Sequence, residues 1–369
     1  HIQLAIMATF ICPLLSLVNL HMLLLLCFVV TTEASVKKVS ALYVFGDSTV
    51  DPGNNNYINT IFTSNFPPYG RDLPNHVPTG RFTNGKLGTD FLASYVGLKE
   101  MLPPYLDPKL SDKELITGAS FASAGSGFDP LTPTFTNVIP IPTQLEYFKE
   151  CKKKLEGILG RERTENHMRN ALFFISAGTN DFVVNYFSVP IRRKSYTLFT
   201  YQQFLLQHVK ELIQNLWTEG GRKIAVVGLP PMGCLPITIT AKSDNSILER
   251  GCVEKLSKVA RDYNLMLQHE LFLMQQNFSS PAKAKISYID IYRPLANMIE
   301  GHQKLGFDEV DIGCCGSGYL EAGFLCNKLS YVCPDPSKYV FWDSIHPSER
   351  AYHNMFLAAR PTIDALVNG

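Results

Sequence analysis

The sequence has no excess of charge of either sign. Lys and Arg number 34 and Asp and Glu 33, so the formal net charge is +1 over 369 residues. A strong positive field attracts nucleic acid or an anionic membrane surface, and this chain lacks one. Short basic clusters at 152–154 and 192–194 are expected to be solvated surface. We therefore expect no nucleic-acid partner.

Sequence motifs of several common binding and catalytic folds are also missing. Gly-x-Ser-x-Gly, which places the nucleophile of α/β-hydrolases, occurs nowhere in the chain. The small-residue run 120–127 lacks the Gly-Lys-Ser/Thr of a P-loop and the spacing of Gly-x-Gly-x-x-Gly. No His lies near the cysteine-rich segment 314–333 at metal-ligand spacing. We therefore expect neither a metal site nor a cofactor.

Lys and Arg are absent from the N-terminal stretch 2–36. This stretch holds one acid, Glu33, and a wholly apolar run at 23–30. Small residues flank Glu33 at the two positions that a signal peptidase reads. We interpret residues 1–34 as a secretory signal peptide.

The mature chain would then be residues 35–369, a single domain that is secreted, extracellular or in the cell wall. A membrane anchor is the competing interpretation, because the apolar stretch from Met7 nears the ~20 residues that a membrane span needs. The sequence begins with His rather than Met, so Met7 or Met22 is a candidate start. We find no other stretch apolar enough to span a bilayer after residue 36, and we expect no transmembrane segment in the mature chain.

Cysteine usage agrees with export. Cys12 and Cys27 fall in the predicted signal peptide, which leaves seven of the nine cysteines in the mature chain. An oxidising compartment would pair most of these, and Cys151 is the expected free thiol. The cysteines expected to pair, in an order that the sequence leaves open, are Cys234, Cys252, Cys314, Cys315, Cys326 and Cys333. The one sequon we find, Asn277-Phe278-Ser279, predicts glycosylation of Asn277.

Short apolar runs alternate with longer segments of helical spacing. The predicted strands are Leu42–Phe45, Leu172–Ile175, Ile224–Val227 and Ile286–Ile291. The predicted helices are Leu87–Val96, Tyr201–Trp217, Val253–Gln276 and Ser348–Val367. This alternation predicts an α/β fold with a parallel sheet covered by helices on both faces.

Polar residues follow the ends of the predicted strands. Parallel sheets collect their chemistry at the carboxyl ends of the strands, near a topological switch point. Ser48 comes just after the first predicted strand, and Gly178-Thr179-Asn180-Asp181 just after the second. The Pro- and Gly-rich stretch 51–86 is too long for a plain connection and too polar to be buried, which favours a substrate-facing loop.

Two separated motifs supply a serine and the two residues that would activate it as a nucleophile. A serine needs a base within hydrogen-bond reach and a third group that orients the base. Gly46-Asp47-Ser48 would present Ser48 at the sheet edge, although this tripeptide is also a common turn. Asp343 and His346 are three residues apart, so Asp343 can orient a ring that reaches Ser48; the alternative is a helix cap and a surface histidine. Pro347 suits the first turn of the helix that follows.

Gly125 and Asn180 are candidate donors for an oxyanion. A backbone N–H at a glycine and a side-chain amide are the donor types that oxyanion holes use. Either residue alone is more often part of an ordinary loop. They become informative as part of a set that occurs in the order Ser, Gly, Asn and then Asp-x-x-His near the end of the chain.

This order resembles the GDSL lipase/esterase family of the SGNH hydrolase superfamily. The chain is most similar to the plant secreted branch of that family, including its extracellular lipase subgroup. The resemblance runs from about Ala41 to Arg360. It rests on Phe45-Gly46-Asp47-Ser48, on Pro78 to Gly85, on Gly228-Leu229-Pro230-Pro231, and on Phe341-Trp342-Asp343-Ser344-Ile345-His346-Pro347.

The resemblance implies a three-layer α/β/α domain with a mostly parallel, flavodoxin-like sheet. It implies Ser48 as nucleophile, His346 as base and Asp343 as its orienter. Ser48, through its own N–H, Gly125 and Asn180 would form the oxyanion hole. The implied activity is hydrolysis of carboxylic acyl esters, either lipids or small acyl esters, through an acyl-enzyme on Ser48 and without a cofactor.

The chain departs from the family pattern at two points. Thr49 stands where the family name has Leu, and Ser123-Ala124-Gly125 stands where members often carry Ser-Gly-Gly, so the donor could lie one residue from Gly125. Two other functions stay open: an acyltransferase that uses the same acyl-enzyme, and an inactive hydrolase scaffold that binds lipid or cell wall.

Overall fold

The computed structural model describes residues 39–243, 250–278 and 284–368. The predicted signal peptide, residues 1–34, lies outside these ranges, as does Ser279 of the glycosylation sequon. Asn277 itself is exposed at the end of a helix. Its glycosylation stays a prediction.

Four parallel strands form the central sheet in the order β1-β2-β3-β4. Their bounds are β1 Leu42–Gly46, β2 Leu172–Ser176, β3 Lys223–Val227 and β4 Lys285–Ile289. All four coincide with predicted strands, to within two residues at each end. A second, two-stranded sheet pairs β5 (Glu309–Gly313) with β6 (Tyr339–Phe341).

The segment 117–123 runs along the free edge of β1. Backbone bonds join Thr117 O to Leu42 N at 3.3 Å and Val44 O to Phe121 N at 2.8 Å. If this segment is counted as a strand, the chain order across the sheet becomes 2-1-3-4-5, which is the flavodoxin-like order. After β1 the chain first adds the segment 117–123 on one side of this strand and then β2 on its other side. The topological switch point therefore lies at the carboxyl end of β1.

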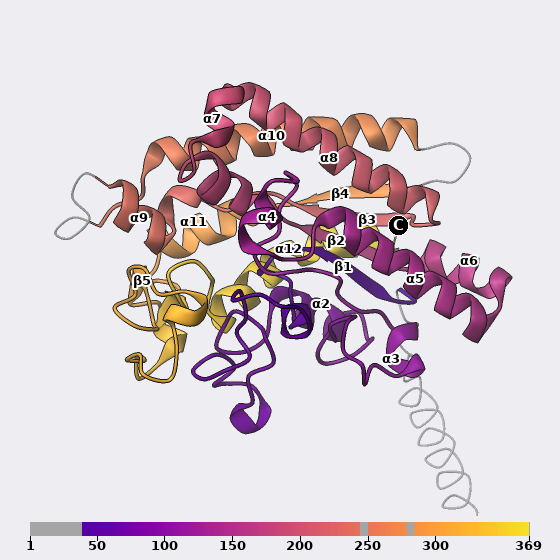
Figure 1. The fold of residues 1–369 in the computed structure, drawn as a ribbon, viewed down its shortest axis with the longest axis horizontal. Coiled ribbons are helices and arrows are strands. Elements are labelled where there is room, and N and C mark those ends of the chain that lie inside the picture. Colours follow the sequence, from indigo (N-terminus) through magenta and orange to yellow (C-terminus); the bar gives the residue numbers. More distant parts are fainter. Residues whose placement is uncertain (1–38, 244–249, 279–283, 369) are drawn as a thin grey trace, which may run out of the picture. The chain divides into compact units, whose positions relative to one another are not determined.

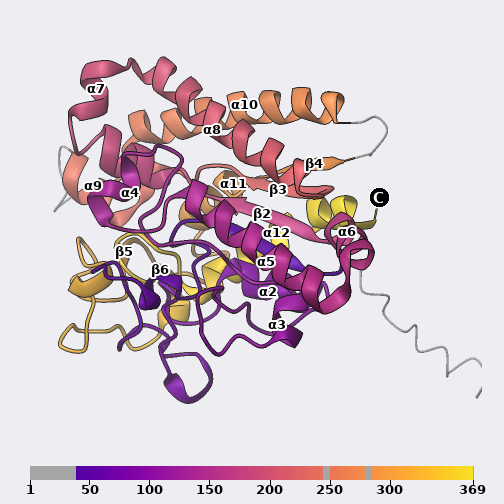
Figure 2. The ribbon, with the colours of Figure 1, turned by 45° about the vertical axis from the view of Figure 1, so that its right-hand side comes forward.

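Helices cover both faces of the sheet because alternate strand residues point to opposite faces. Tyr43 and Phe45 pack in the core under α5 (Ile141–Leu159), α8 (Leu198–Thr218) and α10 (Glu254–Asn277). Leu42 and Val44 pack in a second core with α2 (Gly88–Tyr95) and α12 (Glu349–Asn368). Figures 1 and 2 show α8 and α10 on one side of the sheet and α2 and α12 on the other. The predicted three-layer α/β/α arrangement is confirmed.

Shorter helices complete the connections. The α-helices are α3 (Asp112–Ile116), α4 (Thr132–Thr136), α6 (Arg161–Asn170), α7 (Ile191–Ser195), α9 (Pro236–Lys242) and α11 (Tyr292–Glu300). The 3₁₀ turns are η1 (Asn54–Tyr57), η2 (Pro74–His76), η4 (Met232–Cys234), η5 (Gly323–Leu325) and η6 (Pro336–Lys338), and a π-helical turn, η3, spans Asp181–Tyr186.

Among the described residues, three disulfides cross-link the chain. They join Cys234 to Cys252, Cys314 to Cys333 and Cys315 to Cys326. Cys151 is a buried free thiol, as predicted. Within the described ranges, no helix has the length and apolar content to cross a bilayer.

Candidate active site

The turn that carries Ser48 begins with a glycine that no other residue can replace without strain. Gly46 has a φ of +146°, and a Cβ placed there would lie 1.9 Å from the carbonyl oxygen of Ser176 on β2. The buried Gln144 side chain accepts from Gly46 N–H and donates to Gly46 C=O, both at 2.9 Å. The amide therefore satisfies the last backbone groups of β1 and lets the chain turn away from the sheet.

Asp47 fixes the shape of the turn itself. Its carboxylate accepts from Thr49 N at 3.0 Å and from Thr49 Oγ1 at 2.7 Å. Thr49 Oγ1 also lies 3.0 Å from Ser176 Oγ, so the turn is tied to the end of β2. Burial raises the pKa of the Asp47 carboxyl, which is 2% exposed. The motif alone predicted no role for Asp47 beyond its place next to Ser48.

Asp343 and His346 lie in a tight turn between β6 and α12. Asp343 Oδ1 accepts from the backbone N–H groups of Ile345 at 2.9 Å and His346 at 2.7 Å. The ring nitrogen His346 Nδ1 lies 2.8 Å from Asp343 Oδ2 and 2.9 Å from Oδ1. The contacts within this turn therefore orient the His346 ring independently of the rest of the site.

The helix that follows does not include Pro347. Helix α12 begins at Glu349, where Ser348 Oγ accepts from Ala351 N at 3.3 Å in the manner of an N-cap. Pro347 instead pairs with Phe341 in an antiparallel bridge. The prediction that Pro347 occupies the first helical turn is wrong, because the capping side chain comes one residue later.

The structure brings Ser48, His346 and Asp343 together across 298 positions of sequence. His346 Nε2 lies 2.8 Å from Ser48 Oγ. Their exposed fractions are 7%, 4% and 0% respectively. Since a carboxylate accepts only, Nδ1 carries a proton and Nε2 of the neutral ring accepts from the serine hydroxyl. The arrangement can withdraw the serine proton as the hydroxyl attacks.

Tyr69 forms a hydrogen bond with Asp343, a contact that the sequence motifs did not predict. Its hydroxyl donates to Asp343 Oδ2 at 2.7 Å and accepts from Gly323 N at 2.8 Å. Burial raises the pKa of Tyr69, so the hydroxyl stays a donor. No local pattern indicates this role, because the partner lies 274 positions away.

Tyr69 belongs to the stretch 51–86, which is far more buried than its composition suggests. Arg81 is 2% exposed and forms a bidentate pair with buried Asp90, and Thr83 is fully buried. The ring centroids of Phe82 and His346 lie 5.0 Å apart. The inference that the stretch is too polar to be buried is wrong for residues 51–55 and 80–85, where most polar groups find internal partners. None of its residues lines the pocket beside Ser48 in the described part of the chain.

The two predicted oxyanion donors lie on adjoining segments. Asn180 follows β2, and its Nδ2 donates to the carbonyl of Ser126 at 2.9 Å, which leaves a second N–H on the same nitrogen. Gly125 has a φ of +86° and packs against Thr136. Among the described residues, the N–H groups of Ser48 and Gly125 donate no hydrogen bond within the chain. Asn180 lines the pocket beside Ser48, and Gly125 does not.

Asp181 holds the segment that leads away from Gly125. It accepts from Phe128 N at 2.8 Å, Asp129 N at 3.1 Å and Thr132 Oγ1 at 2.5 Å. A Cβ on Gly127 would lie 2.2 Å from Asp181 Oδ1, so this segment packs directly on the carboxyl. Burial raises the pKa of Asp181 to about 7, against the effect of its hydrogen bonds. The carboxyl thus fixes Asn180, its chain neighbour, relative to the Gly125 turn.

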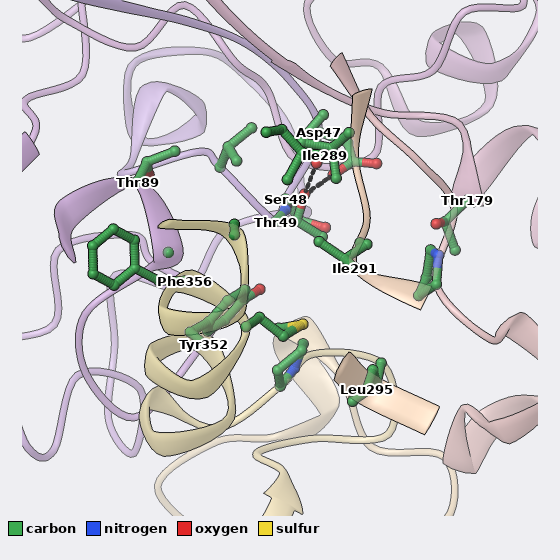
Figure 3. Close-up of a pocket in the computed structure, with 18 of the residues that line it drawn as sticks. Asp47, Ser48, Thr49, Thr89, Thr179, Ile289, Ile291, Leu295, Tyr352 and Phe356 are labelled. Atoms are coloured by element: carbon green, nitrogen blue, oxygen red, sulfur yellow. Dashed lines mark hydrogen bonds between the residues drawn. The ribbon is translucent and has the colours of Figure 1, made fainter. Parts of the chain in front are cut away.

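A pocket of about 100 Å³ opens beside the serine. Figure 3 shows Asp47, Ser48 and Thr49 at one end and Tyr352 and Phe356 on α12. The remaining wall is mostly aliphatic or aromatic. In the ranges that the structure describes, no three His, Cys, Asp or Glu side chains group as metal ligands would.

An α/β/α fold with a serine, histidine and aspartate at the carboxyl edge of its sheet defines a class of serine hydrolase. Residues 42–359 match the model of the GDSL-like lipase/acylhydrolase family. The chain therefore belongs to this family, whose members are carboxylic ester hydrolases.

Curated relatives agree with this assignment. The chain is 60% identical to GDSL esterase/lipase At5g45960 of Arabidopsis thaliana, over 89% of this chain and 88% of that one. It is 44% identical to GDSL esterase/lipase At1g06990 of the same plant, over 87% and 88% of the two chains. A third Arabidopsis relative, GDSL esterase/lipase At2g40250, is also 44% identical, over 90% and 92%.

Replacement of Tyr69 by Phe tests whether the hydroxyl positions Asp343. A hydrogen bond to a charged group contributes about 1.5–3 kcal/mol, so we expect kcat for ester hydrolysis to fall roughly ten-fold or more. KM should change little, because Tyr69 does not line the pocket. Tyr331→Phe is the control, since Tyr331 is 68% exposed. A rise in KM at constant kcat would assign Tyr69 to substrate binding instead.

The raised pKa of Asp181 predicts a pH-dependent loss of stability. The folded chain keeps this proton up to about pH 7, whereas an unfolded aspartate loses it near pH 4. The stability from the neutral carboxyl is therefore complete below about pH 4 and is lost as pH rises through 7. We expect the free energy of unfolding, measured by urea denaturation, to fall between pH 4 and pH 7 in the unmodified chain when it is compared with the Asp181→Asn variant. The exposed Asp112→Asn is the control, and a difference independent of pH would contradict the raised pKa.

Proposed function

We propose that this chain is a secreted esterase that hydrolyses acyl esters through an acyl-enzyme on Ser48. The observation that carries the proposal is the hydrogen-bonded series from Ser48 Oγ through His346 to Asp343, which is almost entirely buried. A serine hydroxyl is a poor nucleophile unless a base removes its proton during attack. Family membership supplies the reaction class, and this geometry supports the assignment of its parts.

In the proposed first step, His346 Nε2 takes the proton of Ser48 as Oγ attacks the ester carbonyl carbon. The carbonyl oxygen gains negative charge and accepts from the Ser48 and Gly125 N–H groups and the Asn180 amide. The same imidazolium then protonates the leaving alcohol. A water molecule attacks the acyl-enzyme with His346 again as base, which releases the acid and restores Ser48.

Export is supported by the chemistry of the cysteines. Six of them form disulfides in the described part of the chain. Such bonds persist in oxidising compartments and are rare in the cytosol. This accords with the interpretation of residues 1–34 as a signal peptide.

Labelling at Ser48 tests the proposed nucleophile. A fluorophosphonate probe should modify Ser48, with the adduct located by peptide mass spectrometry, and Ser48→Ala should remove both the label and turnover, a loss on the order of 10⁶-fold. Ser188→Ala, at an exposed serine, is the matched control. Labelling elsewhere with full activity in Ser48→Ala would overturn the proposal. Products that carry the acyl group on a second alcohol instead of water would assign the enzyme as an acyltransferase.

Replacement of Asn180 by Ala tests the oxyanion hole. Loss of one such donor lowers kcat by roughly 10²–10³-fold with little change in KM, because the contact strengthens in the transition state. We expect this result for p-nitrophenyl butyrate hydrolysis. Asn170→Ala, on the exposed end of α6, is the control. Activity of Asn180→Ala close to that of the control would exclude Asn180 from the oxyanion hole.

A further inference from the structure

The turn that follows Ser48 along the chain binds the segment that carries Gly125. Three polar side chains of this turn, Asp51, Asn54 and Asn55, are almost completely buried. Asp51 Oδ1 accepts from Gly53 N at 2.8 Å and from Asn54 N at 2.7 Å, which closes the turn. None of residues 51–55, all of which the structure describes, lines the pocket beside Ser48. Their contacts therefore act on the neighbouring segment and not on a molecule in the pocket.

Asn54 binds the part of this segment that runs along β1. The N–H groups of Phe121 and Ser123 donate to carbonyl oxygens of β1. The carbonyl oxygens of Ser120 and Ala122 lie between them in sequence, and Asn54 Nδ2 donates to both at 2.8 Å. Asn54 therefore satisfies backbone groups at the edge of the sheet, several residues before Gly125.

Asn55 binds the peptide bond that holds the Gly125 N–H group. Its Nδ2 donates to the carbonyl oxygen of Ala124 at 3.0 Å. The same nitrogen donates to Phe62 O at 2.7 Å, and Asn55 Oδ1 accepts from Ser123 Oγ at 2.5 Å. The Ala124 carbonyl and the Gly125 N–H belong to one planar trans peptide unit, so they point in opposite directions. A donor fixed on the carbonyl oxygen therefore also fixes the direction of the N–H.

Asp51 binds the peptide bond that comes one residue earlier. Its Oδ2 accepts from Ala124 N at 2.9 Å. Burial raises the pKa of Asp51 to about 6, against the effect of its hydrogen bonds from the backbone. Asp51 and Asn55 thus bind the N–H and the C=O of the same residue, Ala124. Both backbone groups that precede the Gly125 N–H are held by one turn.

A peptide bond beside a glycine needs such support. Gly125 has a φ of +86°, and glycine has no Cβ that would restrict rotation about its backbone bonds. Rotation about ψ of Ala124 and φ of Gly125 would turn the peptide plane over. The carbonyl oxygen of Ala124 would then point where the Gly125 N–H points now, and it would repel an oxyanion instead of donating to it.

We propose that Asn55 is a positioning residue for ester hydrolysis, which holds the Gly125 N–H in the direction required of an oxyanion donor, with Asp51 as its support. This inference rests on the proposed function, in which Gly125 donates to the oxyanion formed at Ser48. Asn55 acts through the peptide bond and does not contact the substrate. Its bond to the Ala124 carbonyl also polarises that peptide, which makes the Gly125 N–H a stronger donor.

Replacement of Asn55 by Ala tests this role, and Asn54→Ala is the matched control. Both are buried asparagines of the same turn, but Asn54 binds the Ser120 and Ala122 carbonyls and not the peptide of Gly125. We expect Asn55→Ala to lower kcat for p-nitrophenyl butyrate roughly ten- to hundred-fold with little change in KM, since the contact concerns the transition state. Asn54→Ala should lower stability but leave kcat within about three-fold.

A thiono ester separates positioning of the oxyanion donor from a general loss of structure. Sulfur is a weaker hydrogen-bond acceptor than oxygen, so an oxyanion hole accelerates hydrolysis of p-nitrophenyl thionobutyrate less. The ratio of kcat for the oxygen ester to kcat for the thiono ester should therefore fall in Asn55→Ala, as it should in Asn180→Ala. The same ratio should stay unchanged in Asn54→Ala.

A second variant, Asp51→Asn, guards against misfolding of Asn55→Ala because it keeps the shape of the side chain. An amide has one acceptor oxygen where the carboxylate has two, so it cannot hold both the turn and the Ala124 N–H. We expect kcat and the ratio of oxygen to thiono ester to fall in this variant also, by a smaller factor. The exposed Asp112→Asn should change neither. Thermal unfolding of each variant shows whether it is folded.

Labelling of Ser48 by the fluorophosphonate probe keeps this inference separate from the proposed function. Equal losses of kcat in Asn55→Ala and Asn54→Ala would overturn the inference, although a labelled Ser48 would uphold the proposed function. An unchanged ratio of oxygen to thiono ester in folded Asn55→Ala and Asp51→Asn proteins would overturn it in the same way. An unmodified chain without label on Ser48 would refute the proposed function, and this inference with it.

Discussion

The parallel register of β1 and β2 is the constraint on which the rest of the site depends. It places Gly46 beside Ser176, so the chain that leaves β1 passes within bonding distance of the end of β2. Any side chain at Gly46 would collide with the Ser176 carbonyl. The turn that presents Ser48 therefore requires two strands that end side by side and a glycine at the last position of the first strand. Asn180 comes to the same edge because it follows β2.

Three buried side chains with hydrogen-bond partners hold this edge in one arrangement. Gln144 ties the end of β1, Asp47 shapes the serine turn, and Tyr69 locks Asp343. At such buried positions, a polar group left without a partner would lower the stability of the fold. The partners come from segments distant in sequence, so the geometry of the site is a property of the whole fold. His346 reaches Ser48 without reorganisation, which is the condition for efficient proton transfer.

Local patterns predicted most of the sheet and singled out the serine, histidine and aspartate that meet at its edge, and long-range contacts account for what was missed. The strands were predictable because buried parallel strands are uninterrupted apolar runs. Helix α5 was not predicted, although Ile141, Leu145, Phe148 and Leu155 carry helical spacing that would have indicated it. Tyr69 had no such signal, since the carboxylate to which it donates lies 274 positions away. The burial of stretch 51–86 was missed because composition does not show whether polar groups have partners.

Helix α12 links the position of the proposed base to the packing of the sheet. Its N-cap, Ser348, lies two residues after His346, and Tyr352, one turn later, lines the pocket beside Ser48. Farther along the helix, Ala359 and Ile363 pack in the core that α12 shares with the sheet. A rigid helix cannot move its first turn without moving the face that packs on the sheet. The distance between His346 and Ser48 is therefore set by this packing, and a substitution under α12 that shifts the helix as a body should lower kcat for ester hydrolysis.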